Sequence, residues 1–309
     1  MNHPKLILSL FAIFLLLISV NCLMAQYIIE QTEYTFPFNY DLILEDKEFE
    51  SEEDEGSYIL SIPESKLKEA ALAGGMEILE EKSTIYIDGD NFAVESTSEE
   101  MGKVTMVSDM KTKMMYVIMW DQKKVMEIKP EDLAKMEENV MKAAEAMLEN
   151  VPQEMREQVK VEMEKEKNKP QMKYDAHPTG NKMKLYGFNC EEYRVSKDNE
   201  LIAIWASSEN SELAKEIDRI SGTFDELYRT EDYEDIDEWQ LIPGKIPVQV
   251  KTYRSAMTEE EPGITIQAIT NIDNRKPPAD KFRVPGEDEG FTKGSMMEMM
   301  MQIMPGNEE

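Results

Sequence analysis

Histidine, cysteine and positive charge are all scarce in this chain of 309 residues. It contains two His, two Cys and 34 Lys plus Arg against 63 Asp plus Glu, which gives a formal net charge of −29. Nucleic-acid binding needs cations that neutralise phosphates, so this balance argues against that class of function. It argues equally against electrostatic attachment to an anionic lipid surface. Two histidines also argue against zinc enzymes and His-dependent triads.

Sequence motifs that carry catalysis are missing as well. We find no glycine loop of the kind that cradles phosphate, no nucleophile elbow and no repeat of fixed period. His177 precedes Pro178 in a turn-rich segment and is interpreted as an exposed loop residue. We therefore predict no catalytic residue, no metal ligand and no cofactor. The enzyme hypothesis, as an alternative, requires a compact polar cleft whose carboxylates shift each other's pKa values.

The first 25 residues have the organisation of a secretory signal. Lys5 precedes Leu6 to Val20, a run of fifteen residues without charge, and a less apolar stretch then ends at Ala25. A membrane-spanning helix needs about 20 apolar residues, so this run is short. We expect cleavage after about Ala25, a periplasmic or secreted location, and no transmembrane span in the mature chain. A retained anchor, or lipid attachment at Cys22 despite a poor lipobox, is the alternative.

Cleavage at this point leaves Cys190 as the sole thiol, so no internal disulfide can form. Cys190 is followed by Glu191 and Glu192, whereas a reactive thiol needs positive surroundings. We interpret Cys190 as a small buried apolar side chain.

Short runs with alternating apolar and polar residues are predicted as strands on both sides of a helical insert. Asp88-Gly89 separates two of these runs, and glycine supplies the positive φ of a hairpin turn. The predicted strands are 26–36, 84–87, 90–95, 104–109, 114–120, 125–128, 182–186, 190–196, 201–206, 247–255 and 263–272. Helices are predicted at 66–80 and 211–228, and the acidic run 45–55 is interpreted as a solvated loop. The spacing predicts an antiparallel sheet.

The insert between the two groups of strands is predicted to be a pair of helices. Pro130, Glu131 and Asp132 are typical of a helix start, because acidic side chains oppose the positive end of the helix dipole. An apolar stripe follows at three- and four-residue steps, formed by Leu133, Met136, Val140, Ala144, Met147 and Val151. Pro152 separates this helix from a more charged one at 153–167. We expect the stripe to pack on an apolar surface.

These predictions divide the chain into four parts. Residues 1–25 are the signal, and 26–83 hold the first strand, the acidic insert and a short helix. Residues 84–285 form the main domain with its helical insert at 130–169, and 286–309 form a Met-rich, flexible tail.

Several short motifs, in this order, resemble a known family. They are Ile85-Tyr-Ile-Asp-Gly-Asp-Asn-Phe, Met115-Tyr-Val-Ile, Lys124-Val-Met-Glu-Ile, Tyr186-Gly-Phe-Asn-Cys-Glu-Glu-Tyr, Ile202-Ala-Ile-Trp-Ala, Ile246-Pro-Val and Phe282-Arg-Val-Pro. Over about residues 84–285 the chain resembles a secreted bacterial family known only as a domain of unknown function, number forty-four twelve, which is grouped with the lipoprotein carriers LolA and LolB.

The resemblance implies an α+β fold, in which a curved antiparallel half-barrel sheet of the LolA-like kind has helices packed on its concave face. It also implies a carrier that holds acyl chains between the sheet and the helices. Carriers of this superfamily commonly have an arginine just after the early hairpin that fastens the lid. Ala93 stands at the comparable position, so this contact is not implied for the present chain.

Methionine is abundant, with 24 residues. Its flexible thioether side chain suits either a plastic core or a groove for varied apolar ligands. The Met-rich stretch 296–304 also raises copper(I) binding, although it contains no His or Cys.

The function expected from these observations is a non-enzymatic, exported protein that binds a lipid or lipoprotein acyl chain. The residues expected to line its groove are Tyr116, Ile118, Trp120, Met136, Val140, Met147 and Trp205. The alternative is a structural or protein-interaction module of the cell envelope, in which the helices fill the half-barrel and no ligand binds. An envelope protein partner is expected in preference to direct docking on a membrane, because the chain is so acidic.

Overall fold

The computed structural model describes residues 26–37, 40–44, 47, 49–98, 102–130, 176–197, 200–228, 241–254 and 263–294. The predicted signal segment, almost all of the helical insert and the Met-rich stretch 296–304 lie outside the described residues. What the sequence predicts for those segments stays a prediction.

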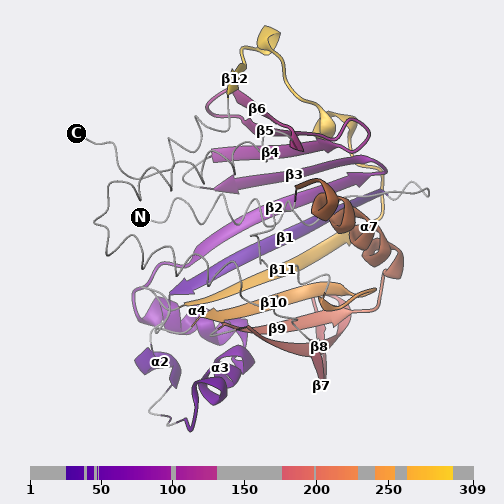
Figure 1. Ribbon diagram of the computed structural model, residues 1–309. Helices are drawn as coiled ribbons and strands as arrows, with labels where there is room; N and C mark the ends of the chain where they lie inside the picture. Colours follow the sequence, from indigo (N-terminus) through magenta and orange to yellow (C-terminus); the bar gives the residue numbers. More distant parts are fainter. Residues whose placement is uncertain are drawn as a thin grey trace, which may run out of the picture.

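The described residues contain one open sheet of twelve strands (Figure 1), in the order β12-β6-β5-β4-β3-β2-β1-β11-β10-β9-β8-β7. The strands are β1 (Gln26–Pro37), β2 (Leu79–Asp88), β3 (Asn91–Ser98), β4 (Gly102–Asp109), β5 (Met114–Met119), β6 (Lys124–Ile128), β7 (His177–Leu185), β8 (Phe188–Lys197), β9 (Glu200–Ser207), β10 (Ile246–Arg254), β11 (Gly263–Asp273) and β12 (Thr292–Gly294). Neighbouring strands are antiparallel, except that β12 runs parallel to β6. The antiparallel sheet with a few helices predicted from the sequence is confirmed in this coarse form.

The first strand lies at the centre of the sheet. β1 pairs with β2 on one side and with β11 on the other. It therefore joins two groups of consecutive strands, β2 to β6 and β7 to β11. The hairpin predicted around Asp88-Gly89 connects β2 and β3, and Gly89 has the expected positive φ of 62°.

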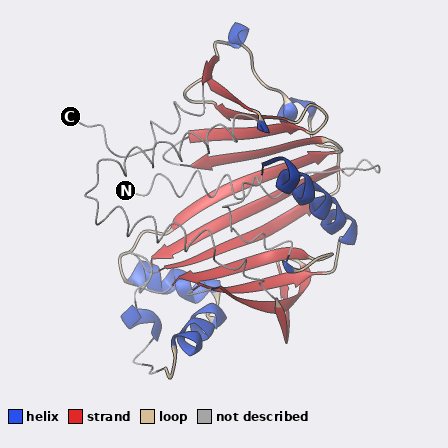
Figure 2. Ribbon diagram, in the orientation of Figure 1, coloured by secondary structure: helices blue, strands red, loops and turns tan. Residues whose placement is uncertain are grey.

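Helices pack on both faces of the sheet. They are α2 (Tyr40–Leu44), α3 (Glu52–Ser61), α4 (Glu64–Ala73) and α7 (Ser211–Tyr228). On one face, which we call the α7 face, Tyr27 and Ile29 of β1 belong to a buried cluster with Ile217 of α7. On the opposite face, the α4 face, Phe36 clusters with Leu67 of α4. Figure 2 shows α7 crossing one end of the central strands, while α2 to α4 gather at the other end.

The chain beyond β11 covers the α4 face over β3 to β6. It contains two short 3-10 helices, η1 (Ala279–Phe282) and η2 (Glu287–Glu289), and ends in β12. Phe291 is buried, and its ring meets that of Trp120 edge to face at 5.5 Å. The prediction of a flexible tail from residue 286 is thus wrong for residues 286–294, because Phe291 and β12 anchor them.

Two further predictions are corrected by the helices before β2. Part of the acidic run 45–55 is helical, because Ser51 caps α3 by accepting a hydrogen bond from the Asp54 N–H at 3.2 Å. The helix predicted at 66–80 is α4, which ends at Ala73 because Gly74 caps it and Gly75 takes a positive φ of 67°. Strand β2 begins at Leu79. The boundary expected between residues 83 and 84 falls inside β2.

Candidate functional site

On the α7 face, apolar side chains lie side by side across seven neighbouring strands. The cross-strand partners, from β11 to β6, are Ile272, Ile29, Ile85, Val94, Met106, Val117 and Met126. We call this set the apolar row. Strands are about 4.8 Å apart, so the row is about 29 Å long. All of its members except the half-buried Ile272 are buried.

A second row runs beside the apolar row on the same face, toward the β2–β3 hairpin. Its members are Tyr27, Ile87, Phe92, Ser108, Met115 and Ile128, and the apolar ones all belong to the same buried cluster. Together the two rows form a continuous apolar surface that includes three methionines. Methionine adapts its shape to irregular partners, so this surface suits contact with flexible apolar groups.

Helix α7 packs against part of this surface through Leu213, Ile217 and Ile220. Arg219 fixes the helix to the β2–β3 hairpin, because its Nη2 donates to the Gly89 carbonyl at 3.1 Å and lies in an ion pair with Glu216. Ala93, on the β3 strand of this hairpin, is buried on the α4 face.

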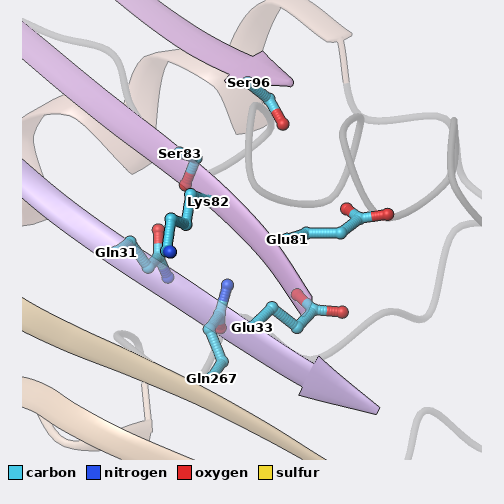
Figure 3. Close-up of a pocket in the computed structure, with 7 residues that line it drawn as sticks. All are labelled: Gln31, Glu33, Glu81, Lys82, Ser83, Ser96 and Gln267. Atoms are coloured by element: carbon cyan, nitrogen blue, oxygen red, sulfur yellow. The ribbon is translucent and has the colours of Figure 1, made fainter. Parts of the chain in front are cut away.

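The same face becomes polar on the other side of the apolar row. Over β1, β2 and β3 the next side chains are Gln31, Ser83 and Ser96, whereas β11 still has the apolar Ile269 beside Gln31. With Glu33, Glu81, Lys82 and Gln267, these three polar residues line a small pocket (Figure 3). The side-chain oxygen Oε1 of Gln31 is buried there and, among the described residues, accepts no hydrogen bond. On β4 and β5 the same position is still apolar, with Val104 and Met119.

A wider depression of about 640 Å³ lies beside the β7–β8 hairpin, lined in part by Lys182, Lys184, Cys190, Glu191 and Lys245. Lys245 donates to Glu191 Oε2 at 2.9 Å. Burial raises the pKa of the Cys190 thiol to about 11, and Glu209 adds to the shift. Cys190 is thus buried and protonated at neutral pH, which agrees with its interpretation as a small apolar side chain.

A buried polar network lies on the α4 face, between β8, β10 and the end of α3. Glu192, 2% exposed, accepts hydrogen bonds from Thr179 Oγ1 at 2.9 Å and Asn181 Nδ2 at 2.7 Å. Lys251, 5% exposed, donates from Nζ to the Ile62 carbonyl at 2.8 Å. Burial and the nearby Arg194 lower the Lys251 pKa to about 8. These groups are hydrogen-bonded within the chain itself, so we assign the network a structural role.

The groove residues predicted from the sequence fall into separate places. Tyr116, Ile118 and Trp120 lie together on the α4 face, under the chain segment that contains Phe282 and Phe291. Trp205 belongs to the cluster of the α7 face. The other three predicted lining residues, Met136, Val140 and Met147, lie outside the described residues. The structure therefore brings three of the seven together and places a fourth in another cluster.

Sequence reasoning missed the apolar row itself, although its signal was available. In β5 and the residue after it, positions 115, 117 and 119 alternate with 116, 118 and 120, and the sequence pattern allows either set to form the groove face. The aromatic residues Tyr116 and Trp120 favoured the set that lies on the α4 face. The α7 face instead carries Met115, Val117 and Met119.

No described helix has the length and apolar character needed to cross a membrane. Among the same residues, no three His, Cys, Asp or Glu side chains are grouped closely enough to hold a metal ion.

Comparison with known proteins shows no family for this chain. No protein-family model matches it, and no curated protein matches it. One solved structure with partial similarity is that of PNGF-II, at 11% sequence identity and a TM-score of 0.28. The match covers 90% of this chain and 33% of the PNGF-II chain, so this chain spans about a third of that protein. A similarity this low carries no functional argument.

Proposed function

We propose that the chain is an exported, non-enzymatic protein of the LolA-like kind, which binds the hydrocarbon part of a lipid or lipoprotein on the α7 face of its sheet. The observation that carries this proposal is the apolar row across seven strands. A sheet surface of this length matches an extended chain, and its methionines adapt to the exact shape of the ligand.

The energy of burial is sufficient for such a role. Each buried methylene contributes about 0.8 kcal/mol, so a chain with a dozen buried carbons gains about 10 kcal/mol before the cost of ordering it. Met115 and Met126 are at most 1% exposed. A ligand must therefore displace the groups that cover these side chains, which makes binding coupled to an opening of the structure.

The same burial favours a second candidate, a structural or interaction module of the envelope whose sheet is filled by its own chain. In that case the Met-rich surface is an ordinary core and has no free space for a ligand. In both candidates the large negative charge favours a protein partner over direct docking on anionic lipid.

Extraction of bound lipid distinguishes the two. The full chain is purified without detergent, extracted with organic solvent and analysed by mass spectrometry. We expect an amphiphile at a stoichiometry near one per chain, and its loss when the protein is unfolded in guanidinium, washed and refolded.

The refolded protein serves as the control. It should bind N-phenyl-1-naphthylamine saturably, with a rise in the fluorescence of this apolar probe. A lipid-free preparation that also shows no saturable probe binding would contradict the carrier proposal and favour the self-filled module.

A further inference from the structure

The polar pocket of Figure 3 lies directly beside the apolar row. Ile29 and Gln31 are successive residues on the α7 face of β1, and Ile85 and Ser83 have the same relation on β2. Val94 and Ser96 repeat it on β3. The change from apolar to polar therefore follows one line across three paired strands. Figure 3 shows the polar side chains Gln31, Ser83 and Ser96 on these strands. A molecule that lies on this face meets both surfaces at once.

The pocket is small, with a volume of about 10 Å³. This is about the space that one water molecule needs. A hydroxyl or an ammonium group has a similar size, whereas a phosphate group does not fit. Size alone thus limits the polar group that can enter fully.

The hydrogen-bonding capacity of the pocket favours a ligand group that donates a hydrogen bond. Oε1 of Gln31 is an acceptor, and a buried acceptor without a partner costs about 1–3 kcal/mol. Ser83 and Ser96 can donate or accept, so they tolerate either kind of group. A donating group that enters the pocket is therefore the kind that removes this cost.

Charge disfavours an anion in the same place. Glu33 and Glu81 contribute carboxylates to the lining, and the one lysine there, Lys82, has its Nζ 2.9 Å from Glu80. A negatively charged head in this pocket would share its lining with two acidic residues, and like charges repel.

We infer that the pocket around Gln31 binds a small, hydrogen-bond-donating head, a hydroxyl or a primary ammonium, of an amphiphile whose hydrocarbon chain lies along the apolar row. This inference rests on the proposed function and adds the chemical class and the orientation of the ligand. Amphiphiles with a carboxylate or phosphate head are the disfavoured class.

Three probes of equal chain length test it on the delipidated full chain: hexadecanol, hexadecylamine and palmitate. Each is used below its aggregation limit to displace N-phenyl-1-naphthylamine. We expect hexadecanol and hexadecylamine to act at concentrations at least tenfold lower than palmitate. The Gln31→Leu variant should reduce this difference to less than threefold, since it removes the acceptor.

Thr97→Val is the matched control, because Thr97 is the exposed neighbour of Ser96 on the opposite face of β3. It should leave the tenfold preference intact. Equal displacement by all three probes, or an unchanged preference in Gln31→Leu, would overturn the inference while the carrier proposal stands. If none of the three displaces the probe, both fail.

Discussion

At the scale of single residues, Lys251 is a lysine that is buried, which is rare for this residue type. Its ammonium group lies under the end of α3 and donates to the carbonyls of Leu60 and Ile62. The last turn of α3 contains no basic residue of its own. Lys251 therefore supplies, from a distant strand, the cation that the negative end of a helix dipole favours.

The lowered pKa of Lys251 predicts a pH dependence of stability. Folded Lys251 loses its proton near pH 8, whereas unfolded lysine keeps its proton until about 10.5. Between these values the unfolded state binds more protons, so the contribution of Lys251 to the free energy of unfolding rises with pH. Denaturant unfolding measures the free energy of unfolding of wild type and Lys251→Met. The value for wild type minus the value for the variant should rise by up to about 3 kcal/mol from pH 8 to 10.5.

Lys66→Met controls for the loss of one lysine, since Lys66 is exposed on α4. A difference between wild type and Lys251→Met that stays flat, or falls, across the window would show that Lys251 is not held in this environment.

This role could not be predicted from the sequence. Alternation along 247–255 predicted a strand correctly, but a lysine in such a strand is usually solvated. Its carbonyl partners are about 190 residues away. They lie in the last turn and at the C-cap of α3, a helix whose start falls in the run interpreted as an acidic loop.

At the scale of elements, two helical glycines have opposite surroundings. A Cβ added at Gly56 in α3 would lie 2.3 Å from Cδ1 of Leu201 and 3.1 Å from Cδ1 of Tyr253, whereas one added at Gly222 in α7 would meet nothing within 4 Å. Alanine favours a helix over glycine by about 1 kcal/mol. Overpacking costs about 1–3 kcal/mol, which is enough to reverse that gain.

We therefore expect Gly56→Ala to lower the free energy of unfolding by about 1 kcal/mol and Gly222→Ala to raise it by a similar amount. Thermal or urea unfolding measures both. Truncation of Leu201 to Ala should make Gly56→Ala less harmful, because the closest clash is gone. Stabilisation by Gly56→Ala in the wild-type background would mean that α3 does not pack on β9 and β10 as described.

The elements that local signals define were predicted best. The predictions of the Asp88-Gly89 hairpin and of the helix Ser211–Tyr228 were both correct, because turn chemistry and helical periodicity depend on residues that are close in the sequence. The placement of β1 between β2 and β11 was not predictable in this way, since no local pattern specifies a partner more than 200 residues away. The irregular register between β1 and β11 also changes which β11 residues share a face.

At the scale of the whole molecule, the sheet separates two surfaces of different character. The α4 face is covered by α3, α4 and the segment that ends at β12. The α7 face carries the apolar row and the polar pocket beside it. The sequence predicted that apolar side chains would cluster on a sheet surface. It placed Tyr116, Ile118 and Trp120 in the groove, and these residues lie on the α4 face.

The central claim is that the α7 face, and not the α4 face, binds an apolar ligand. Met106 and Val107 are adjacent on β4, are both buried, and point to opposite faces. Met106→Gln and Val107→Thr each introduce a polar group with little change in side-chain size, on opposite sides of the same strand.

Titration of delipidated protein with N-phenyl-1-naphthylamine, with unfolding measured in parallel, compares the two variants directly. A buried polar group costs about 1 kcal/mol or more, so we predict that Met106→Gln weakens probe binding by about fivefold or more while Val107→Thr changes it less than twofold. Equal effects of the two substitutions, or a larger effect of Val107→Thr, would contradict the account.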